Sequence, residues 1–240
     1  LVAIAETFYV GLLGTTPLAA LGLVFPFAML TGTLSAGAMG GGVSSAIARA
    51  IGAGDLDRAH VLAMHAILIG AAMGIAYSLF FVFGGPALFR WLGGRGGVLE
   101  EAVRYAGVLF SGAIFVWMSN TLASVVRGTG NMRVPSVGLV LVGLTQIATG
   151  GVLAFGLGPF PALGMVGVAL GNIIAYGSGT AFFAWYLASG IGRLRLRPRA
   201  FPLRLELLVD ILRVGALSCL SPLQTMLTML VFTSLLARLA

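Results

Sequence analysis

Glu6 is the residue of this sequence whose type and setting point most directly to chemistry. It is one of seven acidic residues among 240, and no other charged residue lies between Leu1 and Gly14. A helix rises about 1.5 Å per residue, so Glu6 would lie roughly 12 Å from a turn at Gly14, near the middle of a ~30 Å hydrocarbon layer. An ionised carboxylate is costly at that depth. We therefore expect Glu6 to be an ion-coupling or substrate-binding acid; the alternative is that it faces a wet end of a truncated helix.

The other reactive side chains form no enzyme-like constellation around Glu6. His60 and His65 are five residues apart, so they do not share a helix face as two metal ligands would. Cys219 is the single cysteine and lies in an apolar run, which favours a packed small residue. An intramembrane enzyme would need an HExxH motif, paired aspartates or a nucleophile with its base at depth, and we find none. We expect no enzymatic activity, no metal centre and no cofactor.

The composition identifies the surroundings of these residues as a lipid bilayer. Hydrophobic residues make up 59% of the chain and charged residues 9%, whereas soluble domains carry about 25% charged residues. The apolar runs are continuous and longer than the alternating segments of a transmembrane barrel. The sequence therefore predicts an all-α integral membrane protein, a polytopic helical bundle. Glycines at four-residue spacing predict close helix packing at three places, namely Gly37/Gly41, Gly70/Gly74 and Gly167/Gly171.

Seven apolar segments would position the candidate residues. Pro26 and the run Gly40-Gly41-Gly42 predict bends in the second segment, and Asp55 is placed to cap the start of the third. The first segment ends at Gly14, and the others run over about Pro17–Ile51, Leu56–Leu92, Leu99–Arg127, Val134–Phe155, Ala162–Ser189 and Leu205–Leu239.

The arginines predict the orientation of these segments. The net charge of +7 involves no lysine, and the arginines gather at predicted helix ends, which favours a topology signal over nucleic-acid binding. By the positive-inside rule, the connections after even-numbered segments are cytoplasmic and those after odd-numbered segments lie outside, in a multi-pass protein of the cell (inner or plasma) membrane. Arg90 and Arg95, after the third segment, are the exception. The even-numbered connections hold Arg49 and Arg58; Arg127 and Arg133; and Arg193, Arg195, Arg197, Arg199 and Arg204.

The basic, proline-containing stretch 193–204 predicts a boundary between two membrane units. Residues 1–192 would form a six-helix lobe with a truncated first helix, 193–204 a cytoplasmic linker, and 205–240 the first helix of a second lobe. A weak internal repeat agrees: aligning the end of the chain on Gly14 sets Thr233 on Thr7 and Phe232 on Glu6. Such duplication is common among secondary transporters. We expect this chain to be a fragment of a longer protein.

Four pieces of the sequence resemble the multidrug and toxic compound extrusion (MATE) transporters. They are AETFYVGLLGTTPLAALGL at 5–23, ARAIGAGDLDRA at 48–59, VVRGTGNMRVP at 125–135 and GLGPFPALGMVGVAL at 156–170, in the order of the family's N-terminal half. The resemblance implies a full-length monomer with twelve helices in two lobes around a central cavity. It also implies export of small organic, often cationic, compounds in exchange for entering protons or sodium ions.

The resemblance further suggests which residues would act. The family carries an acid in its first helix, usually aspartate, and Glu6 stands there. It often carries Asn-x-x-x-Asp in its fifth helix, where this sequence has Gln146 and Gly150, so the second acid is missing. Asn172 matches a polar residue of the sixth helix, and Tyr9 lies three residues from Glu6 on an adjacent helix face. The predicted ion-coupling and substrate residues are Glu6, Gln146, Asn172, Tyr9, Thr145 and Thr149, with Glu6, Gln146 and Asn172 as the possible sodium ligands.

Two alternatives concern the coupling ion and the substrate. A lone, desolvated glutamate favours a proton over sodium, because protonation removes most of its burial cost. A lipid-linked saccharide flippase of the same wider transporter group would present arginines to phosphate, but here the arginines lie at predicted helix ends or in the linker. Arg127 and Arg133 are interpreted as orientation signals. Among the other aromatic residues, packing or interfacial roles are favoured over a cavity wall for Trp117, Tyr176 and Trp185.

Overall fold

The computed structural model describes residues 2–196 and 204–239, with side chains described up to residue 228. This part of the chain is helical throughout and contains no strand, which confirms the predicted polytopic helical architecture. The elements are α1 (Val2–Leu13), α2 (Thr15–Gly32), the π-helix η1 (Thr33–Met39), α3 (Gly40–Gly52), α4 (Leu56–Trp91), α5 (Gly96–Ser111), α6 (Ala113–Gly128), α7 (Arg133–Phe155), α8 (Met165–Ser189) and α9 (Leu205–Leu239).

Several of these helices have the length and composition of membrane spans. In the described residues, α2, η1 and α3 form one helix of 38 residues, and this helix, α4, α7 and α8 are each long and apolar enough to cross a membrane. The pair α5 and α6, bent by 42°, makes a fifth span if counted as one, and α1 is a shorter apolar helix. The predicted segments therefore correspond to observed helices, with one difference in the fourth segment.

That fourth segment breaks at Gly112, where the bundle leaves no room for a side chain. A Cβ atom on Gly112 would lie 2.3 Å from Cγ1 of Ile173 on α8. In the second segment the helix runs through both Pro26 and the glycine run without a break, and its irregular part is η1, which ends just before Gly40. Short π-helical stretches inside α-helices are frequent at functional sites.

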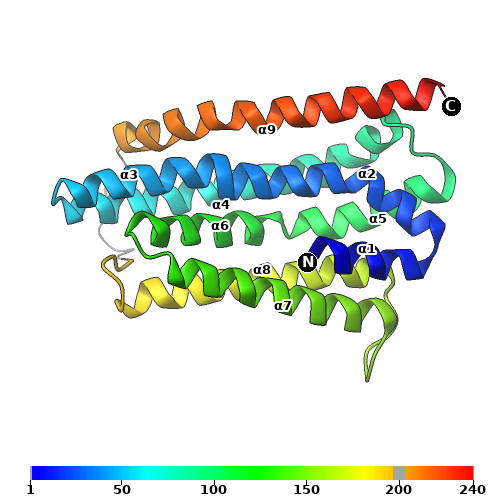
Figure 1. Ribbon diagram of the computed structural model, residues 1–240, viewed down its shortest axis with the longest axis horizontal. Helices are drawn as coiled ribbons and strands as arrows, with labels where there is room; N and C mark the ends of the chain where they lie inside the picture. The colour runs from blue at the N-terminus through cyan, green and yellow to red at the C-terminus, as the bar shows by residue number, and fades with distance from the viewer. Residues whose placement is uncertain (1, 197–203, 240) are drawn as a thin grey trace.

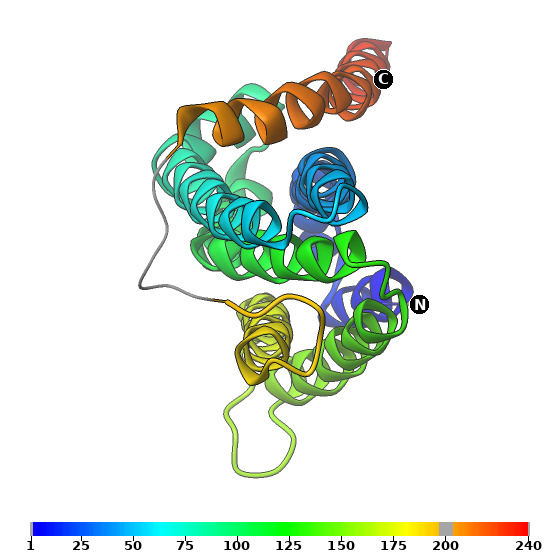
Figure 2. The same ribbon diagram turned by 90° about the vertical axis from the view of Figure 1, so that its left-hand side faces the viewer.

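The connections alternate between the two ends of the bundle (Figure 1). The turns that follow α3, α6 and α8 lie together at the left of Figure 1, and Figure 2 looks onto this end. We call it the arginine-rich end, because Arg58, Arg133 and Arg193 lie in or beside these turns. The turns that follow α1, α4 and α7 lie at the opposite end, which carries Arg90 and Arg95. The spatial grouping of the turns follows the predicted pattern, and the side of the membrane that each end faces stays a prediction.

Glycines let several of these helices approach closely. A Cβ atom on Gly70 would meet Thr121 Oγ1 at 2.5 Å, one on Gly74 would meet Ile114 Cα at 2.8 Å, and α7 and α8 touch in the same way. The prediction for Gly37/Gly41 was wrong, because a Cβ atom at either position would meet no described atom within 4 Å. The close contacts of that helix are made instead at Gly40 and Gly42, on either side of Gly41 in the sequence, and both are buried.

Helix α9 packs along α3 and η1, on the opposite side of the bundle from α7 and α8 (Figure 1). A Cβ atom on Gly42 would lie 2.7 Å from the carbonyl oxygen of Ile211, which is fully buried. Asp210 accepts hydrogen bonds from Arg49 at 2.7 Å and Arg58 at 3.4 Å, so one carboxylate on α9 joins the end of α3 to the start of α4.

The two histidines hold the chain near the two ends of the predicted linker. His60 accepts the backbone N–H of Arg195 at 3.3 Å through Nε2, and His65 accepts that of Arg204 at 3.0 Å. Residues 197–203 of the linker lie outside the described residues, as do the side chains at 229–240 on which the repeat with the first helix depends. The division at 193–204 therefore stays a prediction.

Candidate functional site

The acid of α1 lies in the wall of a cavity inside the bundle. This cavity has a volume of about 310 Å³ and is lined by residues of α1, α2, η1, α5, α7 and α8. Glu6, Gln146 and Asn172 all line it, so the structure brings together three polar residues from three different helices. The rest of the wall is mainly apolar and aromatic, with Phe25, Tyr105 and Tyr176 as its aromatic members.

Glu6 is held by one hydrogen bond from α7. Gln146 is 6% exposed, and its Nε2 donates to Oε1 of Glu6 at 2.5 Å. Small residues on α7 make this contact possible: a Cβ atom on Gly143 would be 3.3 Å from Val2, and one on Gly151 would be 3.1 Å from the Tyr9 ring. The short helix α1 therefore lies directly on α7, and the glutamine side chain, one methylene longer than the asparagine usual in the family, reaches the carboxylate.

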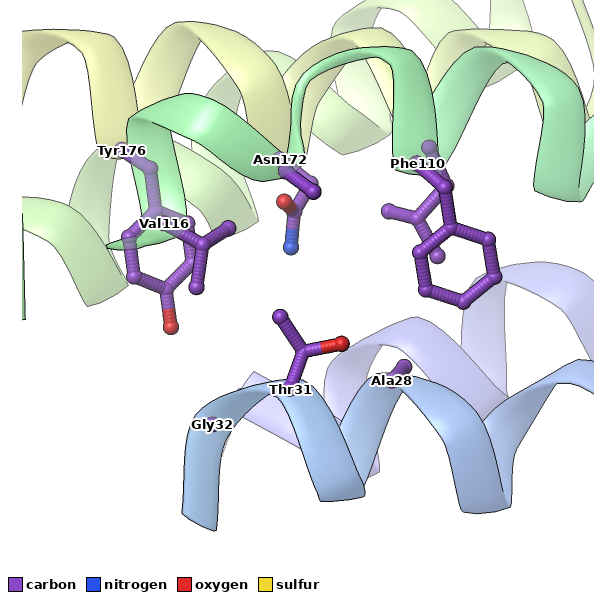
Figure 3. Close-up of a pocket in the computed structure, with 9 residues that line it drawn as sticks. Ala28, Thr31, Gly32, Phe110, Val116, Asn172 and Tyr176 are labelled. Carbon is purple, nitrogen blue, oxygen red and sulfur yellow. The ribbon is translucent and has the colours of Figure 1, made fainter. Parts of the chain in front are cut away.

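Asn172 reaches the same cavity from α8. The adjacent Gly171 packs against α7, where its Cβ atom would lie only 2.5 Å from Gly150 Cα. In a recess that adjoins the cavity, the Asn172 side chain points toward Thr31 on α2, between Tyr176 and Phe110 (Figure 3). Asn172 is half-buried, and within the described residues its amide makes no hydrogen bond. The amide is therefore available to a bound molecule.

The other three predicted residues lie outside the cavity wall. Tyr9 turns toward α7, where its hydroxyl donates to the carbonyl of Ile147 at 3.4 Å and its ring packs edge-on against Phe155. Thr149 donates to the carbonyl of Thr145 at 2.6 Å, the usual way for a threonine to satisfy its hydroxyl within a membrane helix. Tyr9 thus joins α1 to α7, and the Thr149 hydroxyl is satisfied within its own helix.

Two tyrosines lie in the cavity wall although the sequence analysis did not place them there. Tyr176, interpreted as a packing residue, lines the cavity one helical turn after Asn172, and this four-residue spacing is the signal that would have indicated it. Tyr105 on α5 is 3% exposed and was not singled out, although its three-residue spacing from Ala102 and four-residue spacing to Leu109 on the apolar face of an amphipathic helix would have indicated it. Trp117 is buried in the core as expected of a packing residue, and Trp185 is 60% exposed on the surface of α8.

An apolar cavity at mid-length of a helical bundle, with one acid and two amides in its wall, is the kind of site found in membrane transporters. The profile of the MatE family matches residues 1–151, and the chain belongs to this family. Membership agrees with the expectation of a transporter rather than an enzyme, and it confirms the resemblance read from the four sequence pieces.

Named relatives place the chain within one half of longer proteins. It is 30% identical over 169 residues to an FAD transporter of Shewanella oneidensis, covering 69% of this chain and 36% of that protein. It is 27% identical over 219 residues to the probable multidrug resistance protein YoeA of Bacillus subtilis, covering 85% of this chain and 44% of that protein. A solved structure of a multidrug resistance MATE family transporter of the MOP superfamily, in an inward-facing conformation, matches with a TM-score of 0.88 at 32% identity over 95% of this chain and 51% of that chain. The chain thus spans between about a third and a half of the length of these relatives.

Proposed function

We propose that the full-length protein exports small organic, often cationic, compounds by alternating access, in exchange for a cation that binds at Glu6. The observation that carries this proposal is the composition of the cavity wall, in which Glu6 is the only charged side chain among the described residues. An acid without a basic partner in apolar surroundings attracts a proton or another cation strongly, because either one removes the cost of burying its charge.

The proposed coupling ion is a proton. Sodium requires several oxygen ligands held around one point, and Glu6 is the only charged one that the described wall offers. The two threonines of α7 that could have added ligands lie outside the wall. A proton needs only Glu6 and a partner that tolerates both charge states.

Gln146 is such a partner. Its amide carries both N–H donors and a carbonyl acceptor. The N–H group serves an ionised carboxylate, as in the structure, and the carbonyl would accept from a protonated one after the amide rotates. The pair would therefore keep its hydrogen bond whether Glu6 is charged or neutral, so proton exchange need not leave an unsatisfied polar group in the cavity.

The transport cycle then follows from competition for one carboxylate. In the outward-open state Glu6 takes a proton, and a bound cationic compound loses its electrostatic partner and leaves. In the inward-open state Glu6 releases the proton to the cytoplasm and attracts the next compound. Each ligand shifts the equilibrium only through its different affinity for the two states. The arginine-rich end would face the cytoplasm, in accordance with the positive-inside rule.

The wall also suggests the kind of compound carried. A volume of about 310 Å³ lies at the small end of the range of ligand sites. A second lobe, formed by the part of the full-length protein that follows the 193–204 linker, would add a further wall and enlarge the cavity. Aromatic side chains next to a carboxylate suit flat organic cations. The name of one relative, an FAD transporter, agrees with organic aromatic cargo, although FAD is an anion.

The test is transport of a fluorescent cationic dye by the full-length protein in proteoliposomes with an imposed proton gradient. Glu6→Gln should abolish gradient-driven efflux while expression and melting temperature stay close to wild type. Glu6→Asp should retain part of it, because the charge is kept. Glu100→Gln on the exposed end of α5 is the matched control and should transport normally. Undiminished efflux by Glu6→Gln would remove Glu6 from the mechanism.

A further inference from the structure

A second cavity lies nearer the arginine-rich end of the bundle. It has a volume of about 290 Å³ and is lined by residues of η1, α6, α7 and α8 and of the α6–α7 turn, including Asn120, Arg127 and Ser136. Tyr176 lines both this cavity and the Glu6 cavity, so the two adjoin at one side chain. We call the second one the Arg127 cavity.

Arg127 enters this cavity with a charge that no acid neutralises. Its partners among the described residues are both neutral: Nη2 donates to Ser124 Oγ at 2.6 Å and to the carbonyl of Ala36 at 3.4 Å. The wall contains no carboxylate, and the ion pairs of the described residues join Arg49 and Arg58 to Asp210 instead.

Three donors of Arg127 therefore have no protein partner. A guanidinium carries five N–H groups, and the two described bonds both start from Nη2. Within the described part of the chain, Nε and Nη1 make no hydrogen bond. Arg127 is half-buried and lies in the wall of this cavity.

The bound edge of the guanidinium is fixed by a chain of hydrogen bonds across η1. Ser124 donates to the carbonyl of Asn120 at 2.6 Å, and Asn120 Nδ2 donates to Ser35 Oγ at 2.8 Å. Gly40 makes room for the contact, since a Cβ atom there would lie 3.3 Å from Nη2 of Arg127 and 2.5 Å from Ser124 Oγ. Anchoring one edge on a rigid network leaves the other edge in a defined orientation, which is how binding groups are preorganised.

The ordinary roles of an arginine at this position do not account for that arrangement. A cation in the last turn of α6 stabilises the helix end and helps to orient the protein. Arg133, exposed at the start of α7, serves as an orientation signal without lining a cavity. Neither purpose needs a hollow beside the guanidinium or an edge with free donors.

We propose that the Arg127 cavity binds an oxyanion, namely a phosphate group, on the free edge of the Arg127 guanidinium. The planar fork of arginine matches two oxygens of a phosphate, and no carboxylate in the wall competes for it. The phosphate would belong either to an organic solute or to a lipid headgroup. This site goes beyond the proposed cation exchange: it does not use Glu6, and it would persist in Glu6→Gln.

The test is equilibrium binding of radiolabelled inorganic phosphate to the purified protein in a neutral detergent. Wild type should bind saturably, and Arg127→Gln should lose about tenfold or more in affinity, as expected when a charged hydrogen-bond donor is removed. Arg127→Lys should fall between them, because it keeps the charge but loses the fork. Arg133→Gln, in the same turn, is the matched control and should bind like wild type.

Two further arms keep the result decisive. If Arg127→Gln fails to fold, phenylglyoxal modification of wild type is measured by mass spectrometry. Phosphate should protect Arg127 but leave Arg133 reactive, whereas chloride at the same concentration should protect neither.

Nanodiscs of phosphatidylcholine are then compared with nanodiscs containing phosphatidylglycerol. Loss of phosphate binding in the latter identifies a lipid headgroup, and retention identifies a solute. Equal phosphate affinity of wild type and Arg127→Gln, or no protection of Arg127, would overturn the proposal.

Discussion

The contact between α7 and α8 gives the sharpest prediction for stability, because it sets the spacing of Gln146 and Asn172. A Cβ atom added at Gly171 would lie 2.5 Å from Gly150 Cα and 2.6 Å from Gly150 N. Carbon atoms attract at about 3.5–4.0 Å, so the two backbones would have to separate by about 1 Å. No flexible side chain stands between them to absorb the change.

The magnitude follows from two opposing effects of Gly171→Ala. Overpacking a well-fitted contact typically costs about 1–3 kcal/mol. Alanine in place of glycine within a helix returns about 0.5–1 kcal/mol. The net loss should therefore reach up to about 2 kcal/mol, or several degrees in Tm at about 2–4 °C per kcal/mol for a chain of this size.

The assay is thermal unfolding in detergent, followed by intrinsic fluorescence, with Gly177→Ala as the control. Gly177 lies on the same helix, and a Cβ atom there would meet nothing within 4 Å, so its replacement should leave Tm unchanged or raise it slightly. Both variants replace glycine with alanine in α8, but Gly171→Ala should lower Tm, whereas Gly177→Ala should leave it unchanged or raise it. A Gly171→Ala protein that melts at or above Gly177→Ala would refute the close approach of α7 and α8 on which the site depends.

Three other predictions follow from single contacts. Gln146→Leu removes the one described donor to the half-buried carboxylate of Glu6, and loss of a charged hydrogen bond worth about 1.5–3 kcal/mol should lower gradient-driven dye efflux at least tenfold in the proteoliposome assay. Asp210→Asn should change the free energy of unfolding by less than about 1 kcal/mol in chemical denaturation, because its arginine partners are 52% exposed; a larger loss would show that the α9 contact depends on this pair. His60→Phe should speed amide exchange at Arg195 but not at Arg204, measured by mass spectrometry, since the two amides use different histidines.

The helices could be predicted from the sequence because a bilayer makes strong demands on composition. Each span must form its backbone hydrogen bonds within its own helix and present apolar side chains to the lipid. The runs of apolar residues therefore mark the helices directly. The cap at Asp55 was also predictable, and its side chain accepts the N–H of Arg58 at 2.8 Å. The break at Gly112 was not predicted, and the close approach of Ile173 at that point comes from a different helix, more than sixty residues away in the chain.

The rotation of each helix about its axis limited the prediction of the site. A helix that is apolar on all sides gives no periodic signal for its inner face. Glu6, Gln146 and Asn172 could be proposed because polar side chains in lipid must face the interior. Tyr9 and Tyr176 are amphipathic and fit either location, and only the packing of α1 on α7 places Tyr9 outside the cavity and leaves Tyr176 in its wall. Arg127 was assigned to a helix end, which it occupies, but the cavity beside it depends on how four elements meet.

The most direct measurement is the number of protons released when a cationic compound binds to the full-length protein. Titration calorimetry in two buffers of different ionisation enthalpy gives this number at constant pH. We predict release of about one proton per cation in wild type and none in Glu6→Gln, because one carboxylate serves both ligands in turn. Binding of the cation with no proton released, or with the same release in Glu6→Gln, would contradict an exchange at Glu6.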